Sequence, residues 1–162
     1  MHRAMRSPLL ALALIVLFAG TALATISSGL SASILSRGTV TTDKVHFNTG
    51  AIKFQTKEDV DIITQTITFA APSSAGWHAH PGVVLVTVAS GSLVRYDEDC
   101  RRTVYTAGAT TGAGSAFIES GNHAGLVRNE SGASAVVNVT YVVPKGTAAL
   151  RIDKLNPGCP QD

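Results

Sequence analysis

The chain has 162 residues, of which 45% are hydrophobic and 15% are charged, with 13 basic and 11 acidic side chains. This length accommodates one globular domain, and the apolar content excludes an intrinsically disordered protein. A nucleic-acid-binding surface needs clustered Lys and Arg, and the only adjacent basic pair is Arg101 and Arg102. We therefore expect no nucleic-acid partner.

The N-terminus, residues 1–24, has the features of a secretory signal peptide. Arg3 and Arg6 precede an uncharged apolar run of sixteen residues at 9–24, and small residues precede a cleavage point after Ala24. We predict a secreted or extracytoplasmic protein of the cell envelope. The alternative is an uncleaved membrane anchor, although a membrane-spanning helix needs about 20 residues. Cleavage after Ala24 would remove Arg3 and Arg6 and leave 11 basic residues against 11 acidic ones, so the mature chain would have no formal net charge.

The next segment predicts a linker, and the strand pattern begins after it. Residues 25–40 are Ser-rich and only weakly apolar, so we expect a flexible linker there. In the run over residues 60–69, alternate side chains share a face with the period of two that is typical of a strand. Further short β-branched runs, closed by Gly, Ser, Asp or Asn, cover residues 83–91, 93–99, 103–108, 116–121, 126–132 and 135–146.

Helical spacing is absent from the body of the chain. No stretch between residues 38 and 155 places apolar residues three and four apart over ten or more positions. Evenly spaced short strands are typical of barrels and sandwiches. We therefore predict one all-β domain over residues 41–155.

The only two cysteines are Cys100 and Cys159. Outside the cytoplasm such a pair usually forms a disulfide, which would tether the C-terminal tail, residues 156–162, to the domain. Chain-entropy estimates give a loop of about sixty residues a stabilisation of about 4 kcal/mol. A metal-thiolate site is the alternative, but it would need closer spacing.

The sharpest chemical signal is the segment GWHAHPG at residues 76–82. His78 and His80 are two residues apart, so in an extended chain their side chains lie on the same face. Both imidazoles could then reach one metal ion inside a barrel. A pair of surface histidines at the entrance to a strand is the alternative.

This segment resembles the first sequence motif of the cupin superfamily, which contains a Gly, an H-x-H pair, usually a Glu, and a closing Gly. His78 and His80 match the pair, and Gly91 matches the closing glycine. The segment FIESGNHAGLVRN at residues 117–129 resembles the second motif, a turn followed by a His and an Asn. The resemblance implies a single cupin-like double-stranded β-helix, or jelly-roll barrel, after the signal segment.

The sequence departs from both motifs at positions that matter for metal binding. Val84 stands where cupins commonly place a metal-binding Glu, and Gly125 stands where the second-motif His is usual. His123 lies two residues earlier, and two residues of strand span about 6.6 Å, so it could bind only if the turn at Gly121 brought it inward. A three-histidine site and a two-histidine or metal-free pocket both remain open.

Three neutral histidines, His78, His80 and His123, would suit one divalent transition metal such as Zn, Fe, Mn, Ni or Cu. Trp77 and Glu119 are candidate ligand-binding residues. Their alternatives are packing for Trp77 and a solvent-facing position at a strand end for Glu119.

Three functions follow from this pattern. The first is an exported barrel that binds a small molecule and has a weak or degenerate histidine metal site, because Val84 replaces a carboxylate. The second is a metal-dependent cupin enzyme of the oxygenase or isomerase type. The third is an envelope structural protein without a ligand. The sequence leaves open whether the protein is an enzyme, and the resemblance makes a homodimer an expectation.

Overall fold

The computed structural model describes residues 25–41 and 45–160, and every regular element there is a β-strand. In chain order the strands are β1 (Ser28–Val40), β2 (His46–Asn48), β3 (Lys53–Gln55), β4 (Val60–Ser74), β5 (His78–Ala79), β6 (Val83–Ser90), β7 (Ser92–Asp97), β8 (Arg102–Thr106), β9 (Ala116–Glu119), β10 (Gly125–Asn129), β11 (Ala135–Pro144) and β12 (Ile152–Asp153). In this part of the chain, no helix is long and apolar enough to cross a membrane. The predicted signal segment, residues 1–24, lies outside the described residues.

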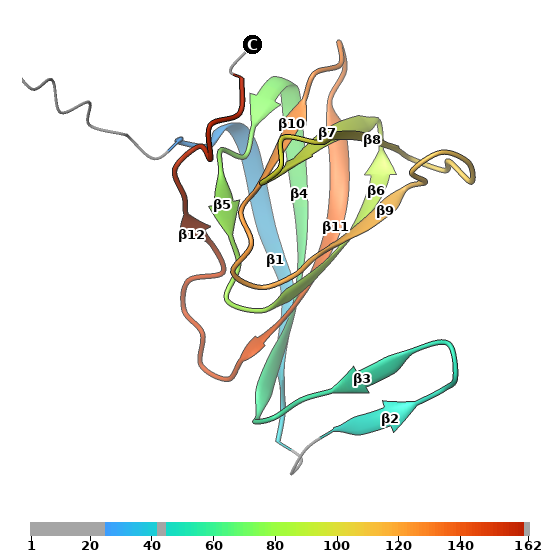
Figure 1. Cartoon of the computed structure of the whole chain (residues 1–162), viewed down its shortest axis with the longest axis vertical. Coiled ribbons are helices and arrows are strands. Elements are labelled where there is room, and N and C mark those ends of the chain that lie inside the picture. The colour runs from blue at the N-terminus through green and yellow to red at the C-terminus, as the bar shows by residue number, and fades with distance from the viewer. Residues whose placement is uncertain (1–24, 42–44, 161–162) are drawn as a thin grey trace, which may run out of the picture.

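Ten of the strands form one antiparallel sheet that curls into a nearly closed barrel (Figure 1). The main path of the sheet is β12-β5-β10-β4-β11-β6-β9; β1 is added to β4, and β7 joins β10 to β8. Strands β2 and β3 form a separate hairpin at one end of the barrel (Figure 1). The prediction of a single all-β barrel is therefore confirmed.

Strands β4 and β11 build the centre of the core. They pair over ten residues, from Val60 with Pro144 to Phe69 with Ala135, and β11 alternates buried and less buried side chains along its whole length. The buried side chains of both strands meet those of β6, β7, β9 and β10 inside the barrel. The core residues are Ile63, Phe69, Ala75, Val84, Val86, Val88, Leu93, Phe117, Val127, Ala135, Val137, Val139, Tyr141 and Val143.

The predicted flexible linker over residues 25–40 is wrong for most of its length. Ser28–Val40 form β1, which pairs with β4 from Ser74 to Val60. Most side chains of β1 are exposed, so backbone hydrogen bonds to β4 rather than side-chain burial define this strand. Leu30 is an exception, because it packs against the core. The barrel therefore begins near residue 28 and not at residue 41.

The predicted disulfide between Cys100 and Cys159 is confirmed, with Cα atoms 5.3 Å apart and a sequence separation of 59. Just before the tail, β12 pairs with β5, the strand that carries His78. The C-terminal segment is therefore fixed at two points, by the covalent bond and by this strand pairing.

Candidate metal centre

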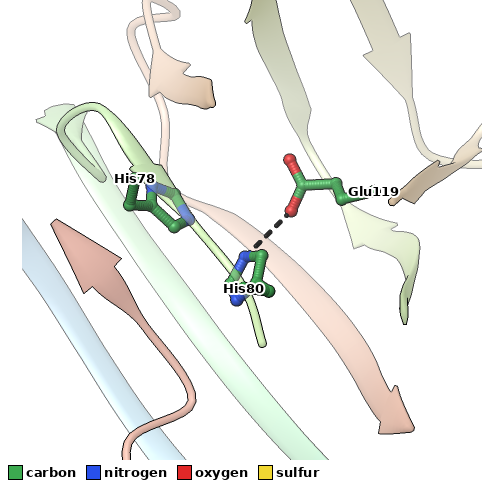
Figure 2. Close-up of side chains that lie close together, drawn as sticks. All are labelled: His78, His80 and Glu119. Atoms are coloured by element: carbon green, nitrogen blue, oxygen red, sulfur yellow. Dashed lines mark ion pairs between the residues drawn. The ribbon is translucent and has the colours of Figure 1, made fainter. Parts of the chain in front are cut away.

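His78, His80 and Glu119 come together on the inner surface of the barrel (Figure 2). His78 belongs to β5, His80 follows it by two residues, and Glu119 ends β9. All three are buried, with 8%, 6% and 7% of their surfaces exposed. One nitrogen of each histidine and one carboxylate oxygen lie within 4.8 Å of one another.

The strand β5 is only two residues long, and neighbours on both sides fix it. His78 pairs with Gly125 of β10 on one side and with Asp153 of β12 on the other. The rings of His78 and His80 both point inward, as the spacing predicts, with their centroids 4.8 Å apart and their planes nearly perpendicular. One nitrogen of each ring therefore faces the same point inside the barrel.

Backbone carbonyls fix the orientation and the tautomer of both rings. His78 Nδ1 lies 2.8 Å from the Gly76 carbonyl oxygen, and His80 Nδ1 lies 2.6 Å from that of Leu150. A carbonyl oxygen only accepts hydrogen bonds, so each Nδ1 is the donor. In a neutral imidazole the other nitrogen, Nε2, then carries the lone pair that binds a metal.

Each carboxylate oxygen of Glu119 has one partner. Arg95 Nε donates to Oε1 over 3.2 Å, and Oε2 faces His80 Nε2 over 3.2 Å (Figure 2). With the His80 proton on Nδ1, both atoms of this second contact are acceptors when the ring is neutral and the carboxylate is ionised. A proton or a cation is needed between them, because two acceptors repel each other.

Burial and neighbouring charges set the protonation states. Burial lowers the pKa of His78 to about 4 and outweighs the hydrogen bond to Gly76 and the charge of Glu119, which raise it. Burial raises the pKa of Glu119, but His80, which in its protonated form donates a hydrogen bond to the carboxylate, and the charge of Arg95 outweigh burial, so this pKa is lowered. A neutral His78 and an ionised Glu119 at neutral pH are the forms that bind metals.

Glu119, which the sequence offers as a ligand-binding candidate and not as a metal ligand, is thus the third member of the cluster. Val84 on β6 pairs directly with Glu119 on β9, so the carboxylate that is absent from β6 is supplied by the adjacent strand. Val84 is itself buried and lines the same cavity. The sequence does contain one signal for this residue. Glu119 follows Phe117 by two residues, so in a strand its side chain points to the same face of the sheet as this core phenylalanine.

Two sequence-predicted residues lie away from this cluster. His123 is a surface residue with 64% of its side chain exposed, and its Nδ1 contacts Glu98 Oε1 at 2.9 Å. The turn at Gly121 does not bring it inward, so the three-histidine arrangement is not formed. Trp77 is fully buried and does not line the cavity beside the cluster, which corresponds to its packing role and not to a ligand-binding one.

Gly125 occupies the place of the second-motif histidine, and its missing side chain leaves room for an ion pair. A Cβ on residue 125 would lie 3.3 Å from Glu119 Oε1 and 3.6 Å from Arg95 Nη2. The Arg95–Glu119 pair therefore occupies the space into which a histidine at this position would begin to extend.

A cavity of about 380 Å³ adjoins the cluster. This volume is in the range of small-molecule sites. Its polar lining includes Gln65, whose side-chain oxygen accepts a hydrogen bond from the hydroxyl of Tyr141 over 2.9 Å. Burial, and then the charge of Glu119, raise the pKa of Tyr141 to about 12, so this hydroxyl stays protonated at neutral pH.

The sequence matches no known family model and no curated protein. Among solved structures, it is similar to a cupin 2 conserved barrel domain protein from Leptotrichia buccalis, with 15% identity, a TM-score of 0.46, and coverage of 70% of this chain and 40% of that one. A cupin superfamily protein from Desulfitobacterium hafniense has 9% identity, a TM-score of 0.47, and coverage of 70% and 77%.

An oxalate oxidase in complex with the substrate analogue glycolate has 17% identity, a TM-score of 0.42, and coverage of 49% of this chain and 41% of that one. The chain thus spans less than half the length of the first and the last of these three structures. This chain is thus similar to solved cupin domains, and it is itself an antiparallel β-barrel with His78 and His80 on its inner surface.

Proposed function

We propose that the protein is a cupin-type metalloprotein in which His78, His80 and Glu119 bind one divalent transition metal ion beside a small-molecule cavity. One observation carries this proposal: His80 Nε2 and Glu119 Oε2 face each other over 3.2 Å, while the other ring nitrogen of His80 is engaged by a backbone carbonyl. A cation at this position would bind both acceptors.

The donor set fits such an ion. Two imidazole nitrogens and one carboxylate oxygen form the triad that binds non-haem Fe(II), and the same donors also suit Zn²⁺ or Mn²⁺. Two atoms that each lie 2.0–2.1 Å from one ion are at most about 4.2 Å apart. The three donors already lie within 4.8 Å of one another, so only small side-chain movements are needed.

When bound, an ion with three protein ligands keeps open positions at which it polarises an oxygen or lowers the pKa of a water molecule. The protein contributes the rest of the site. The carbonyls of Gly76 and Leu150 orient the two rings, and Arg95 holds Oε1 of Glu119. The apolar walls of the cavity limit water around a bound small molecule.

A metal-free binding pocket is the second candidate function. The observation that favours it is the ion pair between Arg95 and Glu119, which gives the buried carboxylate a counterion from the protein itself. In this case the cavity would bind its small molecule by packing and hydrogen bonds alone.

Measurement of metal content separates the two functions. The purified protein is incubated with Zn²⁺, Fe²⁺ or Mn²⁺, dialysed and analysed by mass spectrometry for bound metal. We expect close to one ion per chain in the wild type and loss of the ion in His78→Ala and Glu119→Ala. His123→Ala is the matched control, because it removes a histidine at the surface. A metal-free wild type, or equal metal loss in the control, would contradict the metal site.

We also propose an extracytoplasmic location. The disulfide supports it, because structural disulfides persist mainly in oxidising compartments. The signal-like composition of residues 1–24 agrees with this location. Cell fractionation with an antibody against the protein tests it, together with N-terminal sequencing of the mature chain, for which a start at Thr25 is expected.

A further inference from the structure

Five neighbouring strands of the barrel share an outward surface without a charged side chain. In order across the sheet they are β1, β4, β11, β6 and β9 (Figure 1). Alternate residues of each strand point into the barrel, and the residues between them point outward. The outward residues align in four rows, which are Gly38, Ile62, Val142 and Val83; Ser36, Thr64, Thr140, Leu85 and Ile118; Ser33, Thr66, Asn138, Thr87 and Ala116; and Ser31, Thr68 and Val136. These residues form the outer face of the sheet.

The large apolar side chains of the outer face lie next to one another. Val83, Leu85 and Ile118 have 43%, 42% and 64% of their surfaces exposed, and Leu85 lies directly opposite Ile118. Val142 and then Ile62 continue the row of Val83 across β11 and β4. A contiguous exposed apolar patch marks a surface that binds a partner.

The rest of the outer face carries short, neutral polar groups. Thr66 Oγ1 donates a hydrogen bond to Asn138 Oδ1 over 3.1 Å, from β4 to β11. A polar pair that is already hydrogen-bonded is less costly to bury than an unpaired group. Other strands of the barrel differ, because Arg102 of β8 and Arg128 of β10 both form ion pairs with Glu130.

The chemistry of the outer face favours a second copy of this chain as its partner. A nucleic acid or an anionic membrane needs cationic side chains on the surface that it meets, whereas the core of a protein–protein interface is depleted of charge. A two-fold axis brings the same patch of both subunits together. An uncharged face makes no like-charge contact when it meets its own copy.

The size of the outer face is sufficient for such an interface. Strands about 4.8 Å apart and rows about 6.8 Å apart give it a projected area of about 550 Å². Two copies would then cover about 1,100 Å², and the relief of the side chains raises the accessible area further, toward the 1,200–2,000 Å² of stable interfaces. Two sheets can pack face to face in this way with their strands about 30° apart.

We infer that the protein forms a two-fold symmetric dimer in which the outer faces of two chains pack against each other. The inference goes beyond the proposed function and does not depend on it. The residues that alternate with the outer face, such as Ile67, Val84 and Val137, line the cavity, so the interface and the metal site lie on opposite sides of the same strands.

The test measures the mass of the purified protein by sedimentation velocity, at protein concentrations up to about 200 μM. We expect a monomer–dimer equilibrium in the wild type, with a dissociation constant in the micromolar range or below. The variant Leu85→Lys places a cation without a partner in the apolar part of the interface. Its dissociation constant should rise at least about 100-fold.

Val104→Lys is the matched control. Val104 has the same exposed fraction as Leu85, 42%, but it belongs to β8 and lies outside the outer face. This variant should keep the equilibrium of the wild type. Circular dichroism and Tm report whether each variant folds, and if Leu85→Lys does not fold, Ile118→Lys replaces it, since Ile118 is a more exposed residue of the same face.

Several outcomes would overturn the inference. One is a wild type that stays monomeric, including one that is purified with a different protein on this face. Another is a dimer that persists in the variant on the outer face, or that is lost equally in Val104→Lys. Species larger than a dimer would also contradict it, because an interface with two-fold symmetry closes at two copies.

Discussion

The substitution Glu119→Gln separates metal binding from folding, because the amide is nearly isosteric with the carboxylate. Its oxygen can accept the hydrogen bond from Arg95 Nε that now goes to Oε1. Its nitrogen can donate to the lone pair of His80 Nε2, where the wild type has two acceptors 3.2 Å apart. We therefore expect the metal-free variant to fold, with a free energy of unfolding within about 1 kcal/mol of the wild type.

The two proteins should differ once metal is added. An ion present at 100 times its dissociation constant stabilises the wild type by about 2.7 kcal/mol, or about 5–11 °C in Tm for a domain of this size. In metalloproteins, mutation of a residue that only hydrogen-bonds to a metal ligand already weakens metal binding by about 10- to 100-fold. Loss of a charged ligand should therefore cost at least about 100-fold, which leaves a stabilisation of about 0.4 kcal/mol.

Differential scanning calorimetry with and without Zn²⁺ measures both effects, and equilibrium dialysis gives the affinity directly. The control variant His123→Gln removes a titratable side chain that is exposed and lies away from the cluster, and it should keep the full shift in Tm. If Glu119→Gln also kept the full shift, Glu119 would not be a metal ligand and the argument from the facing acceptors would fail.

Three further predictions follow from the structure. Replacing Cys100 and Cys159 together by Ser should lower the free energy of unfolding by about 4 kcal/mol in urea titrations. A loss below about 1 kcal/mol would contradict the stabilising role of the loop that this disulfide closes, whose ends are separated by 59 positions in sequence. The pKa of His78 is lowered to about 4 from 6.5, so between these pH values the unfolded chain binds more protons than the folded one. The free energy of unfolding of the metal-free protein should therefore fall by up to about 3 kcal/mol as the pH is lowered from 6.5 to 4. The variant His78→Ala should flatten this part of the pH profile. Exchanging the cross-strand pair, as Val84→Glu with Glu119→Val, should retain Zn²⁺ binding by dialysis, whereas Glu119→Val alone should abolish it.

The strands were predictable because alternating apolar side chains mark them. In β11 nearly every second residue is buried, and the sequence shows that period. Strand β1 carries no such signal, since most of its side chains are exposed. Its register comes from the backbone of β4, to which it pairs along thirteen residues of chain, and the side-chain composition of β1 carries no trace of this pairing.

The site was predictable only where its residues are neighbours in sequence. His78 and His80 share a face because they are two residues apart. Glu119 joins them because β9 pairs with β6 in a register that places it opposite Val84, which depends on the whole sheet. His123 was the nearest histidine to the expected position in sequence, yet it lies beyond the end of β9 in a turn and contacts Glu98 at the surface.

Strand β1 has a practical consequence for anyone who shortens this protein. Ser27, Leu30 and Ala32 form part of the cavity wall, and the backbone of β1 covers one edge of β4. The strand pattern first becomes visible in the sequence at residue 41. A version that starts there would lose β1, which would open the cavity to solvent and expose a long edge of the sheet to aggregation. An affinity tag is therefore better joined to the C-terminus, beyond Cys159.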